Sequence, residues 1–287
     1  MTETARAKIN LALHVTARRG DGYHELDSLV AFAAIGDELT ITPASRTTLQ
    51  ITGPFAAQLT GADGNIVLDA VEAMRQAWPH QFAPVAISLT KKLPVASGIG
   101  GGSADAAGVL RGLQQLFGPV EERARLKKIA LQLGADVPVC CLQRACRMSS
   151  IGQQLEVLGD GPSFAAVMVN PGIAVSTPEV FAALGLMPGT PAMPGLPPLP
   201  ATPARQDWIG WLAQCRNDLQ APAISLVPEI DVVLKSIGAA PGCLMHRMSG
   251  SGATCFGVFE DQSSAQRAAD ELSALNKNWW VRATTIA

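Results

Sequence analysis

The stretch LPVASGIGGGSADAAGVLRGLQQLF, residues 93–117, joins a glycine-rich run to a helical pattern. Four glycines fall within positions 98–102, where a backbone without Cβ atoms can adopt positive φ. From Ser103 onward, mostly apolar residues recur at helical spacing, and Ser103 is predicted to be the helix N-cap. The unpaired N–H groups and the positive end of the helix dipole then face the same volume. The stretch therefore predicts an anion site.

Two familiar nucleotide motifs do not fit this run. A Walker A loop has Lys and then Ser or Thr after its last glycine, whereas Ser103 follows Gly102 directly. The dinucleotide fingerprint, begun at Gly98, would need glycine at position 103. The simpler alternative is a flexible loop before a buried helix. The density of glycines, the hydroxyl at the helix start and the helix itself favour phosphate binding.

Length and composition limit the class of protein. The chain has 287 residues, which suggests two domains or one large one, and its 48% hydrophobic residues can fill well-packed cores. A net charge of −2 provides no field to attract nucleic acid, so a phosphate site must be local. The first residues, MTETARAKIN, lack the apolar region of a secretory signal, and no apolar run reaches membrane-spanning length. We expect a cytoplasmic protein.

Six cysteines occur without a CxxC pair and without zinc-finger spacing to a histidine. They are Cys140, Cys141, Cys146, Cys215, Cys243 and Cys255. We expect free thiols in a reducing cytoplasm rather than a metal site.

The remaining sequence predicts alternating strands and helices. Strands are expected at 7–16, 28–35, 38–43, 48–53, 84–90, directly after Asp136, and at 154–159, 164–170 and 279–285; helices are expected at 65–77, 121–133, 206–219, 228–237 and 262–275. Residues 243–249 and 254–259 flank the small-residue run SGSGAT. Gly36-Asp37 is interpreted as a turn between two strands. The character of the chain changes between 145 and 165, which predicts domains at 1–155 and 156–287. The segment MPGTPAMPGLPPLPATP, residues 187–203, is predicted to be a semi-rigid extended loop, with a proline-motif ligand as the alternative.

Asp136 and Lys8 are the residues best suited to chemistry. Phosphoryl transfer needs mainly positioning and charge neutralisation, and a carboxylate near the acceptor hydroxyl can take its proton. Asp136 could serve as that base, or could simply be a turn residue. Lys8 lies on the less apolar face of its strand, where pairing with Asp136 would place positive charge near the migrating phosphoryl group. A solvent-facing strand lysine is the alternative.

Two other segments could contact a ligand. Tyr23, the only tyrosine, lies with His24 in a polar turn, from which an aromatic ring can stack on a planar ligand or pack against strands. The run SGSGAT at 249–254 offers N–H groups and hydroxyls, and with the first glycine run it could close over a polyphosphate. Small residues also mark tight packing, so this signal is weak by itself.

The segments AKINLALHV, GYHEL, GIGGGSADAA, GADVPV and MSGSGAT, in this order, resemble the GHMP kinase superfamily. The AKIN…GYHEL start joined to GADVP is similar to the members that phosphorylate a cytidine-diphosphate-linked methylerythritol. The resemblance implies an α+β, two-domain fold: an N-terminal nucleotide domain with a left-handed βαβ crossover and a C-terminal α/β substrate domain. It also implies ATP-dependent transfer to a 2-hydroxyl in the non-mevalonate isoprenoid pathway. ATP and Mg²⁺ are the implied cofactors.

The resemblance implies a role for each matching residue. Asp136 and Lys8 match the catalytic base and its paired lysine. Two larger sets match the ligand contacts: Asn65, Lys91, Pro94, Ser97, Gly98, Ile99, Gly100, Gly101, Gly102 and Ser103 on the ATP side, and Asn10, Tyr23, His24, Thr177 and Phe181 on the cytidine side. The cytosine is expected between Tyr23 and Phe181, with His24 at its polar edge. The Ser103 hydroxyl is our candidate Mg²⁺ ligand.

The chain departs from the pattern at Arg6, at 95–97, at 149–156 and in the length of the proline-rich segment. Two other functions fit these residues less well. A superfamily kinase acting on homoserine or mevalonate would have no use for an aromatic sandwich, and a nucleotide-binding protein without catalysis would not need both Lys8 and Asp136. We expect a small-molecule substrate, no nucleic-acid or membrane partner, and a monomer or weak homodimer.

Overall fold

The structure is a computed structural model that describes residues 1–59, 64–159, 161, 163–190, 192–201 and 204–287. The chain divides into two compact units that are interleaved along the sequence. The first unit comprises Met1–Lys8, Ile35–Val95 and Gly100–Gln143, and the second comprises Ile9–Ala34, Ala96–Ile99 and Arg144–Ala287. The division into domains at residue 155 stays a prediction.

The first unit contains a βαβ segment. β3 (Thr48–Thr52) and β4 (Val85–Thr90) are parallel neighbours, joined through a 3-10 turn, η1 (Ala56–Leu59), and α1 (Ile66–Ala77). β4 pairs antiparallel with residues 38–43 of β2 (His24–Pro43), which gives the order β3-β4-β2. β2 and its partner β1 (Thr2–Arg18) both contribute residues to the two units. The βαβ arrangement expected from the sequence is thus present.

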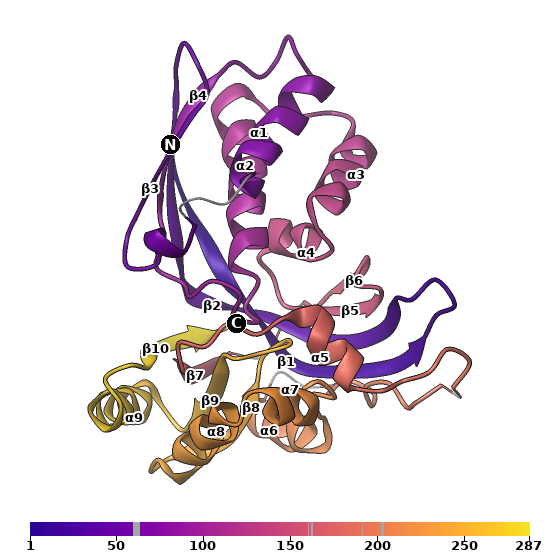
Figure 1. Cartoon of the computed structure of the whole chain (residues 1–287), viewed down its shortest axis with the longest axis vertical. Coiled ribbons are helices and arrows are strands. Elements are labelled where there is room, and N and C mark those ends of the chain that lie inside the picture. Colours follow the sequence, from indigo (N-terminus) through magenta and orange to yellow (C-terminus); the bar gives the residue numbers. More distant parts are fainter. Residues whose placement is uncertain (60–63, 160, 162, 191, 202–203) are drawn as a thin grey trace. The chain divides into compact units, whose positions relative to one another are not determined.

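Three further helices complete the first unit: α2 (Gly101–Phe117), α3 (Arg123–Leu133) and α4 (Val137–Leu142). Figure 1 shows them gathered with α1, and α2 packs against α1, α3 and α4. α2 lies close to β2 because Gly108 lacks a side chain: a Cβ there would be 2.5 Å from Leu39 Cδ1. This close packing sets the position of the helix that the glycine run begins.

The second unit has an antiparallel sheet in the order β10-β7-β9-β8. The strands that lie wholly in the second unit are β5 (Cys146–Ser150), β6 (Gln154–Val157), β7 (Phe164–Asn170), β8 (Cys243–Met248), β9 (Cys255–Phe259) and β10 (Trp280–Ile286). The helices of this unit are α5 (Thr177–Ala183), α6 (Arg205–Gln214), α7 (Gln220–Leu226), α8 (Glu229–Ala239) and α9 (Gln262–Leu275). α8 packs on β8 and β9, and α9 packs on β7, β9 and β10. Residues 26–30 of β2 pair with β5.

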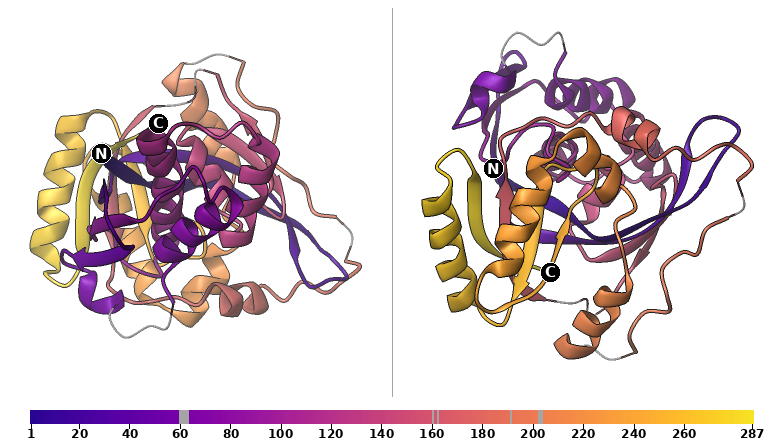
Figure 2. Two further views of the ribbon diagram at one scale, coloured as in Figure 1. Left: turned by 90° about the horizontal axis from the view of Figure 1, so that it is seen from above. Right: turned by 60° about the horizontal axis from the view of Figure 1, so that its bottom comes forward.

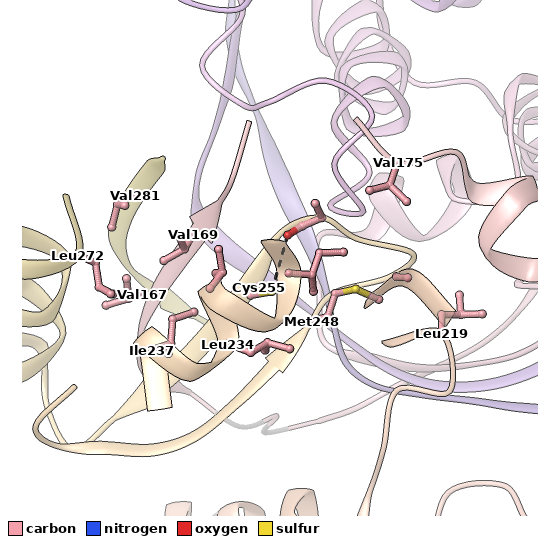
Figure 3. Close-up of a cluster of buried hydrophobic side chains, with 14 of the residues drawn as sticks. Val167, Val169, Val175, Leu219, Leu234, Ile237, Met248, Cys255, Leu272 and Val281 are labelled. Carbon is pink, nitrogen blue, oxygen red and sulfur yellow. Dashed lines mark hydrogen bonds between the residues drawn. The ribbon is translucent and has the colours of Figure 1, made fainter. Parts of the chain in front are cut away.

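The core of the second unit lies between this sheet and its helices. Figure 3 shows Val167 and Val169 of β7 near Ile237 of α8 and Leu272 of α9, all members of one buried cluster. Fully burying an aliphatic side chain contributes roughly 1.5–3 kcal/mol. The cluster therefore holds α8 and α9 against the sheet.

The structure differs from the sequence predictions at several points. β2 runs without a break through Gly36, where a Cβ would lie 2.3 Å from the Ala5 carbonyl oxygen, so glycine provides space for β1 instead of a turn. The apolar run after Asp136 is the short helix α4, with proline in its first turn, because so short a run is equally compatible with helix and strand. Helices α5 and α7 were not predicted, because each has only seven residues.

The proline-rich segment forms no helix or strand in its described residues 187–190 and 192–201, as predicted; positions 191, 202 and 203 lie outside the described residues. Residues 193–198, called the strap here, run along the β1–β2 hairpin, as Figure 2 shows. The Met193 N–H donates to the Thr16 carbonyl at 2.7 Å, and the Leu196 N–H donates to Asp27 Oδ2 at 2.8 Å. Part of the predicted surface loop is therefore fixed to the sheet.

Asp27 is the residue that anchors the strap. It also accepts two hydrogen bonds from Arg147 of β5, at 2.8 and 2.7 Å. Burial by itself would raise the pKa of Asp27, but the bonds from Arg147 and the Leu196 N–H outweigh it and lower the pKa below its ordinary value. A lowered folded pKa contributes stability that is present at neutral pH and is lost as the pH falls through the acid range below about 4.

We therefore expect Asp27→Asn to lower the melting temperature at pH 7, and the deficit to shrink as the pH falls below about 4, because the unfolded chain then takes up a proton at Asp27 before the folded chain does. Calorimetry of both proteins between pH 3 and pH 7 measures the difference. A deficit that stays constant over this range would show that the Asp27 carboxylate charge does not stabilise the fold.

The six cysteines are free thiols. Among the described residues, no helix is both long and apolar enough to cross a membrane.

Candidate active site

The glycine run begins α2 in the way an anion site requires. Gly100 is the N-cap with φ +64°, a left-handed conformation that favours glycine, and no side chain caps the helix start. The first N–H groups of α2 are thus not used by a capping side chain. The prediction that Ser103 is the N-cap is wrong, because the left-handed turn at Gly100 starts the helix at Gly101.

Gly98 and the 249–254 run are in direct contact within the second unit. Gly98 has φ +74°, and a Cβ there would lie 2.4 Å from the Ser249 carbonyl oxygen and 2.7 Å from the Gly252 nitrogen. The Ser249 hydroxyl donates to the Gly98 carbonyl at 3.1 Å. The hydroxyl-bearing residues of the run, Ser249, Ser251 and Thr254, are buried and hydrogen-bonded within the protein. The 249–254 run therefore packs against the glycine run at Gly98.

Lys8 and Asp136 form the ion pair expected from the sequence. Lys8 Nζ lies 2.8 Å from Asp136 Oδ2, and the Lys8 side chain is buried while about a third of the Asp136 side chain is exposed. Asp136 is the residue before α4, yet its carboxylate makes no capping bond there. The Lys8 stem packs on the glycine run, because a Cβ on Gly100 would be 3.3 Å from Lys8 Cβ. The first unit thus brings an accessible carboxylate, an ammonium and the start of α2 together.

These residues suit a magnesium-bound polyphosphate. The start of α2 offers N–H donors and a positive dipole end to phosphate oxygens. Ser103 and Asp136 offer oxygen ligands of the kind that Mg²⁺ takes, and Mg²⁺ usually completes its shell with water and substrate phosphates. Among the described residues, no group of three or more His, Cys, Asp and Glu side chains could hold a metal. A magnesium ion carried by nucleotide phosphates fits this donor set.

The other residues expected on the ATP side are placed as follows. Asn65 is the N-cap of α1, where its side-chain oxygen accepts the Val67 N–H at 2.9 Å. Pro94 is buried, and the buried Ser97 accepts the Thr254 N–H through its carbonyl at 3.1 Å. Ile99 is fully buried.

The Lys91 side chain does not face an open site. Its ammonium is buried between Asp37 and Asp105, at 2.5 and 2.7 Å. Burial, opposed by Lys91 and reinforced by the neighbouring Asp37 carboxylate, raises the pKa of Asp105 to about 8. The Lys91 ammonium is committed to the two carboxylates, and the Lys91 N–H and carbonyl are hydrogen-bonded to Thr52 and Phe55. Sequence reasoning missed Asp37, which was interpreted as a turn residue, and Asp105, an acid among the alanines of a buried helix face.

Asn10 and Thr177, both expected on the cytidine side, are held by neighbours in the second unit. The Asn10 amide donates to Ser28 Oγ at 2.8 Å, while its Oδ1 atom is buried without a hydrogen-bond partner in the described part of the chain. A buried amide oxygen without a partner is unusual and leaves an acceptor for a ligand donor. Thr177 Oγ1 lies 2.7 Å from Ser251 Oγ, which ties α5 to the 249–254 run.

His24, not Tyr23, stacks on Phe181 in this structure. The His24 and Phe181 ring centroids are 4.7 Å apart with 28° between the planes, whereas Tyr23 is 61% exposed. Burial and the nearby Arg18 lower the pKa of His24, so its ring is neutral at pH 7. His24 therefore covers the face of the Phe181 ring on which the cytosine was expected to stack.

One groove, which was not predicted from the sequence, is lined in part by Glu25, the residue after His24. It has a volume of about 710 Å³ and is lined by Thr16, Glu25, Leu26, Asp27, Arg147, Ser149, Ser150, Gln154, Leu155 and Glu156. Ser150 has φ +60°, in the left-handed region that favours glycine. The departure at 149–156 thus places a non-glycine residue with positive φ at the end of β5.

Comparisons with known proteins identify the family of the chain. The GHMP kinases N terminal domain matches residues 65–144, and the GHMP kinases C terminal domain matches residues 204–278. The 4-diphosphocytidyl-2-C-methyl-D-erythritol kinase of Rhizobium etli is 48% identical over 99% of this chain and 94% of its own length. A crystal structure of 4-(cytidine 5'-diphospho)-2C-methyl-D-erythritol kinase superposes with a TM-score of 0.81 and 34% identity, over 100% of this chain and 99% of that one.

Homoserine kinase from Cytophaga hutchinsonii superposes with a TM-score of 0.69 over 100% of this chain and 94% of its own, but at 18% identity it shares the fold alone. The predicted α+β GHMP kinase fold is confirmed. The sequence identity of 48% over nearly the whole length also favours the cytidine-diphosphate subgroup over the homoserine and mevalonate kinases. The chain belongs to the 4-diphosphocytidyl-2-C-methyl-D-erythritol kinase family of the GHMP kinases.

Proposed function

We propose that this protein transfers the γ-phosphoryl group of ATP to the 2-hydroxyl of 4-diphosphocytidyl-2-C-methyl-D-erythritol, a step of the non-mevalonate isoprenoid pathway. The observation that carries the proposal is the 2.8 Å ion pair between Lys8 and the accessible Asp136, in the same compact unit as the uncapped start of α2. A base, a cation and a phosphate-binding helix end are the parts that phosphoryl transfer needs.

Asp136 takes the proton of the acceptor hydroxyl as the new O–P bond forms and the bond between the γ-phosphorus and the bridging oxygen of the departing ADP breaks. Lys8 holds the Asp136 carboxylate in place through its 2.8 Å contact and contributes positive charge beside the transferred group. Its buried stem, packed against Gly100, limits how far the ammonium can move.

The N–H groups of Gly101, Gly102 and Ser103 hold the phosphates, and Gly98, Ile99 and Gly100 shape the turn before them. Asn65, Lys91, Pro94 and Ser97 contribute to the adenosine side. Mg²⁺, when bound with ATP, neutralises charge on the transferred phosphoryl group. Ser103 is the side chain we propose to reach it through its hydroxyl.

On the acceptor side, Asn10, Tyr23, His24, Thr177 and Phe181 bind the cytidine diphosphate end. The unpartnered Asn10 Oδ1 is available to accept a hydrogen bond from the acceptor. Binding of the base between Tyr23 and Phe181 requires His24 to leave the Phe181 ring, on which it stacks at 4.7 Å. His24 then reads the polar edge of the cytosine.

Replacing Tyr23 by alanine is expected to raise the KM for the cytidine substrate about tenfold, with kcat and the KM for ATP little changed. Stacking of a base on an aromatic ring is worth roughly 1–3 kcal/mol, and each 1.4 kcal/mol is tenfold in affinity. Steady-state kinetics with each substrate varied in turn measures this split. Tyr23→Phe, which keeps the ring, is the matched control. An unchanged KM in Tyr23→Ala would place the base elsewhere.

The proposed function is tested by ADP release with the cytidine-diphosphate substrate, homoserine and mevalonate as separate acceptors. We expect turnover with the first alone. Turnover with homoserine or mevalonate and none with the cytidine substrate would refute the proposal. A cytoplasmic location and a monomer or weak homodimer remain predictions, and sedimentation at micromolar concentration tests the latter.

A further inference from the structure

Lys91, Asp37 and Asp105, called the Lys91 cluster here, form a buried group of charges in the first unit. The side chains of the three residues are 2%, 0% and 3% exposed. Lys91 Nζ donates to both carboxylates. The cluster holds two acids for one base, and Asp105 Oδ1 is buried without a hydrogen-bond partner in the described part of the chain.

Each member of the cluster comes from a different element. Asp37 lies in β2, Lys91 follows the last residue of β4, and Asp105 lies on α2 one turn after its first residue. Asp37 Oδ1 also accepts the N–H groups of Lys92 and Leu93, at 2.5 and 2.9 Å. The cluster therefore ties the residues that open the 91–100 loop to the helix that follows it.

The Lys91 cluster lies next to Gly101, the first residue of α2. A Cβ on Gly101 would be only 3.3 Å from Lys91 Nζ, so the absence of a side chain at the first helical residue lets the ammonium approach. Gly101 is also the first of the residues whose N–H groups point from the helix start. The Lys91 ammonium therefore lies against the first residue of α2.

Stability alone gives a poor reason for this cluster. Removing charges from water costs several kcal/mol per ion, and well-packed apolar residues often serve the fold as well or better. What a charge cluster does supply is direction, since its hydrogen bonds are satisfied in few geometries.

We propose that the Lys91 cluster is a positioning device for nucleotide binding, which fixes the first turn of α2 so that the N–H groups of residues 101–103 are aimed at the phosphates. The inference rests on the part of the proposed function that places ATP at α2, and on no assumption about the acceptor. Lys91, Asp37 and Asp105 act through α2 and do not touch the nucleotide phosphates with their side chains.

The test compares two substitutions of Asp105 by the affinity for ADP, measured by calorimetry without any acceptor. Asp105→Asn keeps an oxygen for Lys91, and its dissociation constant is expected to stay within threefold of the unchanged chain. Asp105→Leu removes the contact but leaves Lys91 paired with Asp37, and its dissociation constant is expected to rise at least tenfold. Asp105→Ser, too short to reach Lys91, is a second variant with the same expected loss if the leucine variant does not fold.

Lys92→Met is the matched control. Lys92 is the adjacent lysine, and its ion pair with Glu38 is about half exposed, so its removal is expected to leave ADP affinity unchanged. Folded Asp105→Leu or Asp105→Ser protein that binds ADP within twofold of the unchanged chain would overturn the inference and leave the proposed function intact. An unchanged chain that binds no ADP would overturn both, because the nucleotide would not lie at α2.

Discussion

Asp136→Asn is expected to lower kcat by roughly 10²–10⁴-fold, the usual contribution of a positioned general base, with the affinity for ATP little changed. The amide keeps the size of the side chain and an oxygen for Lys8 Nζ, which lies 2.8 Å from the carboxylate in the unchanged chain. It removes only the ability to accept a proton. Steady-state kinetics with both substrates, and nucleotide affinity by calorimetry, separate the two effects.

Glu229→Gln is the control for this substitution. Glu229 is an exposed carboxylate at the first residue of α8, outside the residues assigned to the site. We expect its kinetics to match those of the unchanged chain. Near-normal kcat in Asp136→Asn would show that Asp136 is only a turn residue before α4.

Gly98→Ala is expected to give the second-largest effect, a rise of at least tenfold in the KM for ATP together with a lower melting temperature. Gly98 has φ +74°, where a residue with a Cβ costs about 1–2 kcal/mol. The added Cβ would also lie 2.4 Å from the Ser249 carbonyl oxygen, a backbone atom that cannot rotate away. The loop must therefore move away from the 249–254 run that supports it.

Gly102→Ala isolates this effect within the same glycine run. Gly102 lies in the first turn of α2 without a positive φ, and the nearest atom to an added Cβ is Ile66 Cγ2 at 3.9 Å. Alanine is also the better helix former, so the melting temperature is expected to be unchanged or higher. Equal melting temperatures for Gly98→Ala and the unchanged chain would mean that the loop tolerates a Cβ at position 98.

The sequence predicted most of the long periodic elements and the residues with evident chemistry. The helix at 262–275 and the helix after Asn65 were placed well, because each has a strong 3.6-residue pattern. The pairing of Lys8 with Asp136, 128 positions apart, was expected from complementary charge and from the family resemblance. Local pattern by itself left Asp136 equally compatible with a turn.

The misses have physical causes that a single sequence does not display. Glycine serves both as a turn former and as a space for another backbone, and only the neighbour distinguishes them, as Ala5 does at Gly36. The role of Asp37 and Asp105 depends on Lys91 arriving from another element, so neither residue shows its partner locally. The stacking of His24 on Phe181 joins residues 157 positions apart and has no local signal.

Phosphorus NMR of the product tests the central claim most directly. The protein is incubated with ATP and 4-diphosphocytidyl-2-C-methyl-D-erythritol, and the new phosphomonoester signal is recorded with proton coupling. C2 carries the methyl group and no hydrogen, so a phosphate on the 2-hydroxyl is predicted to give a signal without three-bond coupling to a carbon-bound proton. A new signal split by such coupling would place the phosphate on C1 or C3, and the absence of any new phosphomonoester would refute the kinase assignment.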